Sequence, residues 1–67
     1  MRTYICLIAD DRFAVPSLLF QEAKDDLAIR AMALAQLRAN PHWQSLEVRL
    51  DDEVVFTLER ADADVHG

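Results

Sequence analysis

The chain has 67 residues, of which twelve are acidic and seven basic, and its formal net charge is −5 at pH 7. This charge repels a phosphate backbone and leaves no basic stripe that could release counterions, so direct nucleic-acid binding is not expected. Hydrophobic residues make up 52% of the sequence, enough for a core, but no apolar run has the length of a membrane span. The single cysteine excludes an internal disulfide and indicates a reduced, cytoplasmic protein.

The short length is a further constraint. A chain of this size buries a smaller fraction of its surface than a larger domain does, which leaves a monomer marginally stable. No zinc-type Cys/His spacing compensates, and no ligand pattern points to another cofactor. Association is the remaining remedy, so we expect one domain over residues 1–60 that forms a homodimer or small oligomer, followed by a disordered tail at 61–67.

Two strands are predicted before the helix. Residues 2–9 combine β-branched and aromatic side chains and are apolar on both alternating sides, which is typical of a central strand. A polar turn at 10–12 and Pro16 separate it from residues 17–23, SLLFQEA, which we interpret as its hairpin partner. The alternative is a helix that starts at Pro16 and runs to Ala39, since proline is favoured in a first helical turn.

Residues 24–39, KDDLAIRAMALAQLRA, are the longest regular segment and predict a helix. Asp25 and Asp26 are suited to capping its first turn, whereas inside the longer alternative helix they would be poor helix formers. Pro41 cannot continue the hydrogen-bond ladder, so the helix should end near Asn40.

The predicted helix is apolar almost all round. At about 100° per residue, Leu27, Ala31 and Leu34 form one stripe, which we expect to face the sheet. Ile29 and Ala33 then fall on the far side, where a second subunit would cover them. The alternative is that the alanines tolerate water and the outer face has only a small exposed patch.

Two more strands should follow the helix, at 45–51 and 54–60, because apolar and polar residues alternate in both. The acidic turn at 51–53 lacks glycine, so a longer or bulged turn is expected in place of a tight primed one. The inward-facing residues are Leu46, Val48 and Leu50 in the first of these strands and Val54, Phe56 and Leu58 in the second.

This order of elements predicts an α+β fold with two layers: a four-stranded antiparallel or mixed sheet with one helix on one face, in the order ββαββ. The other face is uncovered, and it presents an apolar surface if Tyr4, Cys6, Leu19 and Val55 point that way. Trp43, in the loop after the helix, either fills the end of the core or anchors an interface. The predicted interface residues are Tyr4, Ile29, Met32, Ala33, Gln36 and Trp43.

The segments EAKDDLAIRAMALAQL and SLEVRLDDEVVFTLER resemble small uncharacterised bacterial proteins common in alphaproteobacteria, in which a strand leads into an Asp-rich cap, an Ala-rich helix and a closing hairpin. The resemblance covers most of residues 3–60, implies the same fold and carries no catalytic motif. The helix, Trp43 and the following strand are also similar to dodecin, a small flavin-storing assembly whose tryptophan stacks on the flavin ring. The chain departs from that family by its additional segment, 10–23, and by shorter final strands.

Candidate catalytic and metal-binding residues are few. Cys6 is the only thiol, and a cysteine in the middle of an apolar strand is typical of a core. His42 follows a proline and is expected to be a solvated turn residue, and His66 lies in the tail, where we expect no metal site. The carboxylates at 10–11 and 51–53 lack the spacing of a calcium loop, so we expect solvated turns and no enzyme activity.

The leading hypothesis is therefore a non-enzymatic interaction module that associates with itself through the helix, the open sheet face or both. A second hypothesis is a small-molecule carrier of the dodecin type that uses Trp43. A third is an antitoxin-like partner of a basic protein, which the net charge of −5 permits.

Overall fold

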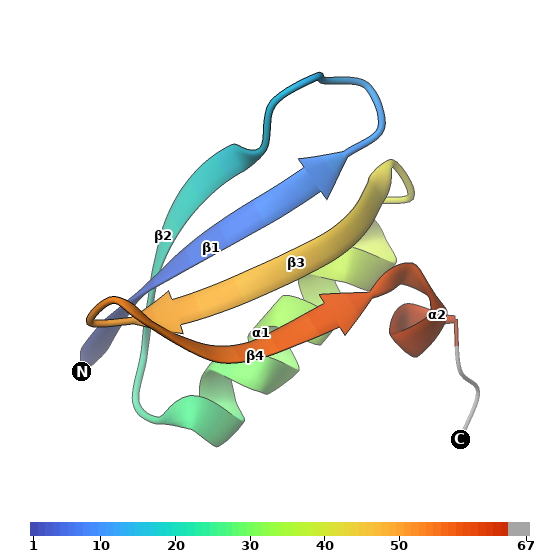
Figure 1. Cartoon of the computed structure of the whole chain (residues 1–67). Helices are drawn as coiled ribbons and strands as arrows, with labels where there is room; N and C mark the ends of the chain where they lie inside the picture. Colours follow the sequence, from blue (N-terminus) through green and yellow to red (C-terminus); the bar gives the residue numbers. More distant parts are fainter. Residues whose placement is uncertain (65–67) are drawn as a thin grey trace.

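The computed structural model describes residues 1–64, which form a four-stranded antiparallel sheet with the main helix packed on one face (Figure 1). The strand order is β2-β1-β3-β4, so β1 and β3 are central and β2 and β4 are the edges. The predicted ββαββ fold is confirmed. The elements are β1 (Arg2–Asp10), β2 (Ser17–Ala23), α1 (Asp26–Ala39), β3 (Trp43–Leu50), β4 (Glu53–Glu59) and α2 (Arg60–Ala63).

The helix α1 begins and ends where its capping residues require. The Asp25 carboxylate accepts a hydrogen bond from the Ala28 amide at 2.8 Å, which satisfies one of the unpaired donors of the first turn. Asn40 follows the last helical residue, and its side chain donates to the Gln36 carbonyl at 2.7 Å. The alternative helix from Pro16 is wrong, because β2 pairs with β1 along its whole length. Neither helix of the described chain is long and apolar enough to cross a membrane.

The face that α1 turns to the sheet differs from the prediction. Ile29, Ala33 and Leu37 are buried, whereas Leu27, expected to lead the inward stripe, is 79% exposed. Residues spaced by four lie on one face of a helix, and this stripe is about 200° away from the one that contains Leu27 and Ala31. Ile29 and Ala33 therefore belong to the core and are not an outer face that awaits a second subunit.

The two faces of the sheet are also assigned by the structure. Tyr4 and Cys6 on β1 point to the helix layer and are buried, as is Ala23 on β2, and Leu19 lies on that same side opposite Cys6. The expectation that Tyr4, Cys6, Leu19 and Val55 could form the uncovered face is wrong, because the first three point to the helix side and Val55 is half-buried against the core.

On β3 and β4 the alternation is confirmed for Leu46, Val48 and Leu58, which are buried. It fails at Val54, which is 52% exposed. The register shifts between Val48 and Arg49, so that Val48 pairs with Phe56 while Arg49 pairs with Val54. The additional residue on β4 moves Val54 to the open face, as a β-bulge does.

The β3–β4 connection is tight. Leu50 pairs with Glu53, which leaves two turn residues, and both have positive φ: 50° at Asp51 and 68° at Asp52. This is the backbone of a type I′ hairpin turn, so the expected longer turn is wrong, although a bulge does lie close by in the strands. Aspartate tolerates the left-handed region better than most residues, which explains how the turn forms without glycine.

The chain after β4 is partly ordered. Residues 60–63 form α2, so the expected disorder is wrong for 61–63 and the last strand ends one residue before Arg60. The Glu59 amide donates to the Asp62 carboxylate at 2.8 Å at the start of α2. Arg60 anchors this segment, because its guanidinium donates to the carbonyls of Leu37 at 2.6 Å and of Asn40 and Trp43 at 3.0 Å each. The end of the predicted tail, 65–67 with His66, lies outside the described residues.

The turn geometry gives a stability prediction. Replacing Asp52 by glycine should raise the free energy of unfolding by about 0.5–1 kcal/mol, because glycine has no Cβ and avoids the steric penalty at positive φ. This gain exceeds the free-energy cost of the greater conformational entropy that glycine loses on folding. Urea unfolding at pH 7 measures the change. Asp52→Ala removes the same charge but keeps the Cβ, so it should not stabilise; equal gains in both variants would assign the effect to charge.

Candidate interaction site

The longest uncharged stretch near the surface is residues 13–21, FAVPSLLFQ, which covers the end of the β1–β2 connection and most of β2. The large apolar side chains Phe13, Val15, Leu18 and Phe20 are 57–71% exposed. Since β2 is an edge strand, this stretch combines unpaired backbone groups with exposed apolar side chains. An exposed, apolar edge of this kind is typical of a surface that associates with another strand.

The open face of the sheet extends this surface. Phe20 pairs with Ile5 and Leu18 with Leu7 across the β2–β1 ladder, and Ile5 and Leu7 are half-buried. Residues directly opposite in an antiparallel pair share one face, so the four side chains form a single apolar block away from the helix. We call the four together with Phe13 and Val15 the β2 patch. The prediction of an apolar open face is thus met by other residues than those expected.

The opposite half of the same face is polar. On β3, the Arg49 guanidinium lies 2.6 Å from the Glu47 carboxylate, and on β4, Thr57 is opposite Glu47. Val54 is an isolated exposed apolar residue there. A β-bulge protects an edge strand from pairing, and β4 contains one, whereas β2 pairs with β1 without a register shift.

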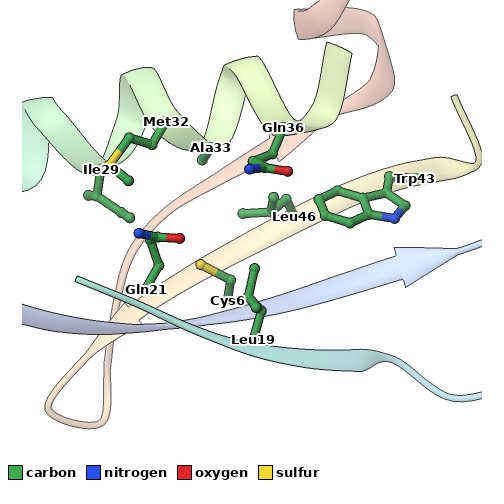
Figure 2. Close-up of a pocket in the computed structure, with 9 residues that line it drawn as sticks. All are labelled: Cys6, Leu19, Gln21, Ile29, Met32, Ala33, Gln36, Trp43 and Leu46. Atoms are coloured by element: carbon green, nitrogen blue, oxygen red, sulfur yellow. The ribbon is translucent and has the colours of Figure 1, made fainter. Parts of the chain in front are cut away.

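On the helix side, a shallow groove runs between β2 and α1 (Figure 2). Its walls are almost entirely apolar, and the space that they enclose would hold about one water molecule. Figure 2 shows the side chain of Gln21 rising from β2 toward the helix, and the amide of Gln36 pointing toward the indole of Trp43 at one end. The lining residues are Cys6, Leu19, Gln21, Ile29, Met32, Ala33, Gln36, Trp43 and Leu46.

Most of the predicted interface residues line this groove. Ile29 and Ala33 are in its buried wall, while Met32, Gln36 and Trp43 are at least partly accessible. Tyr4 is not part of it, because this side chain is fully buried and donates a hydrogen bond to the Asp26 carboxylate at 2.6 Å. Tyr4 therefore fastens the N-terminal end of α1 to the sheet and offers no surface for a partner.

The β2 patch itself was missed. The strand predictions include Ile5, Leu7, Leu18 and Phe20 but do not put them on the open face, and Phe13 and Val15 are predicted in the connection between the two strands. The absence of charge from Phe13 to Gln21 is nevertheless visible in the sequence. In a chain in which 28% of residues are charged, nine consecutive uncharged residues indicate a candidate interaction surface when they lie on a sheet edge.

The turn before Phe13 is held by a buried carboxylate. Asp10 is only 6% exposed and accepts hydrogen bonds from the Arg12 amide at 2.9 Å and from the Arg12 guanidinium at 3.0 and 2.7 Å. The guanidinium lies 5.4 Å from the centre of the Phe13 ring, within the range of a cation–π contact. Asp10 therefore positions Arg12, and Arg12 orients Phe13 at the end of the β2 patch.

A second polar contact joins this turn to the α1–β3 connection. The Asp11 amide donates to the His42 carbonyl at 2.9 Å, and the His42 Nδ1 lies 3.1 Å from the Asp11 carboxylate. Both side chains are about half-exposed. Among residues 1–64, no group of three His, Cys, Asp or Glu side chains is placed to hold a metal ion.

Cys6 is the one thiol of the chain, and it forms part of the groove wall. It is buried, and this burial raises the pKa of the thiol above its ordinary value. The thiol form is therefore favoured over the nucleophilic thiolate at neutral pH. This environment fits the packing role predicted for Cys6.

Comparison of the chain with protein-family models, with curated proteins and with solved structures gave no match. The resemblances to alphaproteobacterial proteins and to dodecin stay predictions. A function for this surface therefore rests on its own contacts, burial and charge.

The Asp10 contact predicts a pH dependence. Hydrogen bonds from Arg12 lower the pKa of Asp10 from 3.8 to about 2. A lowered folded-state pKa means that the ionised carboxylate stabilises the fold above about pH 4, and that this contribution is lost as the pH falls toward 2. Asp10→Asn should thus be less stable than the wild type at pH 6, with the difference shrinking between pH 4 and pH 2 in thermal unfolding. A difference that is constant with pH would contradict the prediction.

Proposed function

We propose that the protein is a non-enzymatic interaction module that associates with itself, and that a second copy docks on the β2 patch and the β2 edge. The observation that carries the proposal is the uncharged stretch from Phe13 to Gln21, whose large apolar side chains are exposed along the edge strand β2, next to its unpaired outer side. Association at this surface would cover apolar side chains and pair the free backbone groups of β2 at once.

The size of the patch supports a dimer of moderate strength. The exposed fractions of Phe13, Val15, Leu18 and Phe20, applied to their side-chain areas, amount to on the order of 500 Å² of apolar surface. Standard interfaces bury about 800 Å² per partner, and patches above a few hundred Å² on a monomer commonly mark interaction sites. Backbone and rim contacts along β2 would supply the remainder.

Charge favours the same surface. Two copies that each carry −5 repel one another, so they can approach only where charge is sparse. The stretch 13–21 meets this condition, whereas the half of the open face formed by β3 and β4 carries Glu47 and Arg49.

The location that we propose for the protein is the cytoplasm. Its single cysteine is a buried free thiol, which is compatible with a reducing compartment.

The carrier hypothesis has one supporting feature, the indole of Trp43 at the end of an apolar groove. The groove encloses space for about one water molecule, far below the roughly 300–1,000 Å³ of typical small-molecule sites, so we rank this function second. Trp43 is the only tryptophan, so its fluorescence reports binding directly. We expect added flavin to leave its emission unquenched after correction for absorbed light; saturable quenching would favour the carrier.

Self-association is tested by one charge placed in the patch. Wild-type protein at micromolar concentration should sediment at twice the chain mass of 7.6 kDa. Phe20→Glu should weaken the dimer by at least about 100-fold, because a carboxylate from each copy would lie among the apolar side chains of the other without a partner. Phe20 is largely exposed in the single chain, so the variant should still fold, which circular dichroism checks.

The matched control is Val54→Glu, which places the same charge on the same face but at the β4 edge. This variant should remain dimeric. A wild-type chain that is monomeric throughout the micromolar range would overturn the proposal, and equal loss of the dimer in both variants would place the interface elsewhere on the open face.

A further inference from the structure

The outer edge of β2 is open to a second strand. Its inner edge pairs with β1 at seven positions, from Ser17 opposite Ile8 to Ala23 opposite Arg2. Within residues 1–64 no strand lies on the outer side of β2, and Figure 1 shows β2 at the edge of the sheet with β1 as its neighbour on the inner side. An additional strand there would pair backbone groups that the monomer leaves to water.

A second copy can supply that strand with twofold symmetry. When two identical edge strands pair antiparallel about an axis perpendicular to the sheet, each residue is opposite one that points to the same face. Neighbouring residues of a strand point to opposite faces, so an axis between two residues would put each residue opposite one that points to the other face. The axis must therefore pass beside a residue, which is then opposite its own copy. Only a few registers of β2 are therefore available.

The residues of β2 discriminate among these registers. With Leu19 on the axis, Leu18 is opposite Phe20 of the second copy and Ser17 is opposite Gln21, so every pair within residues 17–21 is uncharged. The next pair, Pro16 opposite Glu22, lies at the end of this paired stretch. A shift to Phe20 places Glu22 opposite Leu18 inside the paired stretch. A shift to Leu18 leaves only residues 17–19 of β2 opposite one another, because Phe20 is then opposite Pro16, which has no amide hydrogen to donate.

We infer that the self-association proposed above is a pairing of β2 with β2 of a second copy, with Leu19 beside the twofold axis. The two four-stranded sheets then form one continuous sheet, with both α1 helices on the same side. On the open face, Leu18 and Phe20 of the two copies form one cluster across the axis. This proposal rests on the proposed function and specifies its partner and register.

The same register completes the groove. Leu19 lines the groove on its β2 side and is 38% exposed at the sheet edge. In the pairing, Leu19 of the second copy lies directly opposite on the helix side, where it covers this exposed wall. The groove between β2 and α1 thus gains its missing side from the partner.

Disulfide trapping tests the register. In a Cys6→Ala background that still sediments as a dimer, Leu19→Cys should cross-link to its own copy with oxidised glutathione, because directly opposite residues have Cα atoms about 4.5–5.5 Å apart. Ser17→Cys should not cross-link to itself, since its two copies would be more than about 13 Å apart along the strands. A mixture of Ser17→Cys and Gln21→Cys chains should give the mixed disulfide.

The mixed pair leaves Leu19 unchanged, so it tests the register even if Leu19→Cys disturbs folding. A dimer in which Leu18→Cys or Phe20→Cys links to itself and Leu19→Cys does not would overturn the register but leave self-association in place. A dimer in which none of these cysteines cross-links would show that β2 does not pair with β2. A chain that sediments as a monomer would overturn the proposed function itself.

Discussion

The position of α1 on the sheet depends on the Arg60 guanidinium. It donates to the carbonyls of Leu37, Asn40 and Trp43, so one side chain joins the end of α1, the following turn and the first residue of β3. The last carbonyls of a helix have no partner within it, and a cation at this end also interacts favourably with the negative end of the helix dipole. At the other end of α1, Tyr4 donates to Asp26. The helix is held at both ends, and this determines which of its faces is buried.

These two contacts explain why the strands could be predicted better than the helix orientation. In β3, Leu46 and Val48 alternate with polar residues, so the sequence alone shows which side of the strand faces the core. Around α1 there is no such contrast between a polar and an apolar side, because the stripes led by Leu27 and Ile29 are similarly apolar. The choice between them is made by tertiary contacts from Arg60 and Tyr4, which are 31 and 25 positions away from Ile29 in the chain.

The same ambiguity affected the sheet faces and the interface. β1 is apolar at every position from Tyr4 to Ala9, so periodicity could not tell which set meets the helix. The structure buries Tyr4 and Cys6 and leaves Ile5 and Leu7 toward the open side. As a consequence, the evidence for association moves from α1 to β2. The inference of excess apolar surface holds, whereas its predicted location on Ile29, Ala33 and Tyr4 does not.

The geometry of the layers explains why the excess lies at β2. A helix with its side chains is about 10 Å wide, while four strands at about 4.8 Å spacing span nearly twice that width, so one helix covers only part of the sheet. The β4 side is closed by α2, whose Ala63 is buried and whose first residue is Arg60. No described element does the same beyond β2, and the groove lies in that gap. A second copy paired along β2 would bring its own sheet and helix to the side that this chain leaves open.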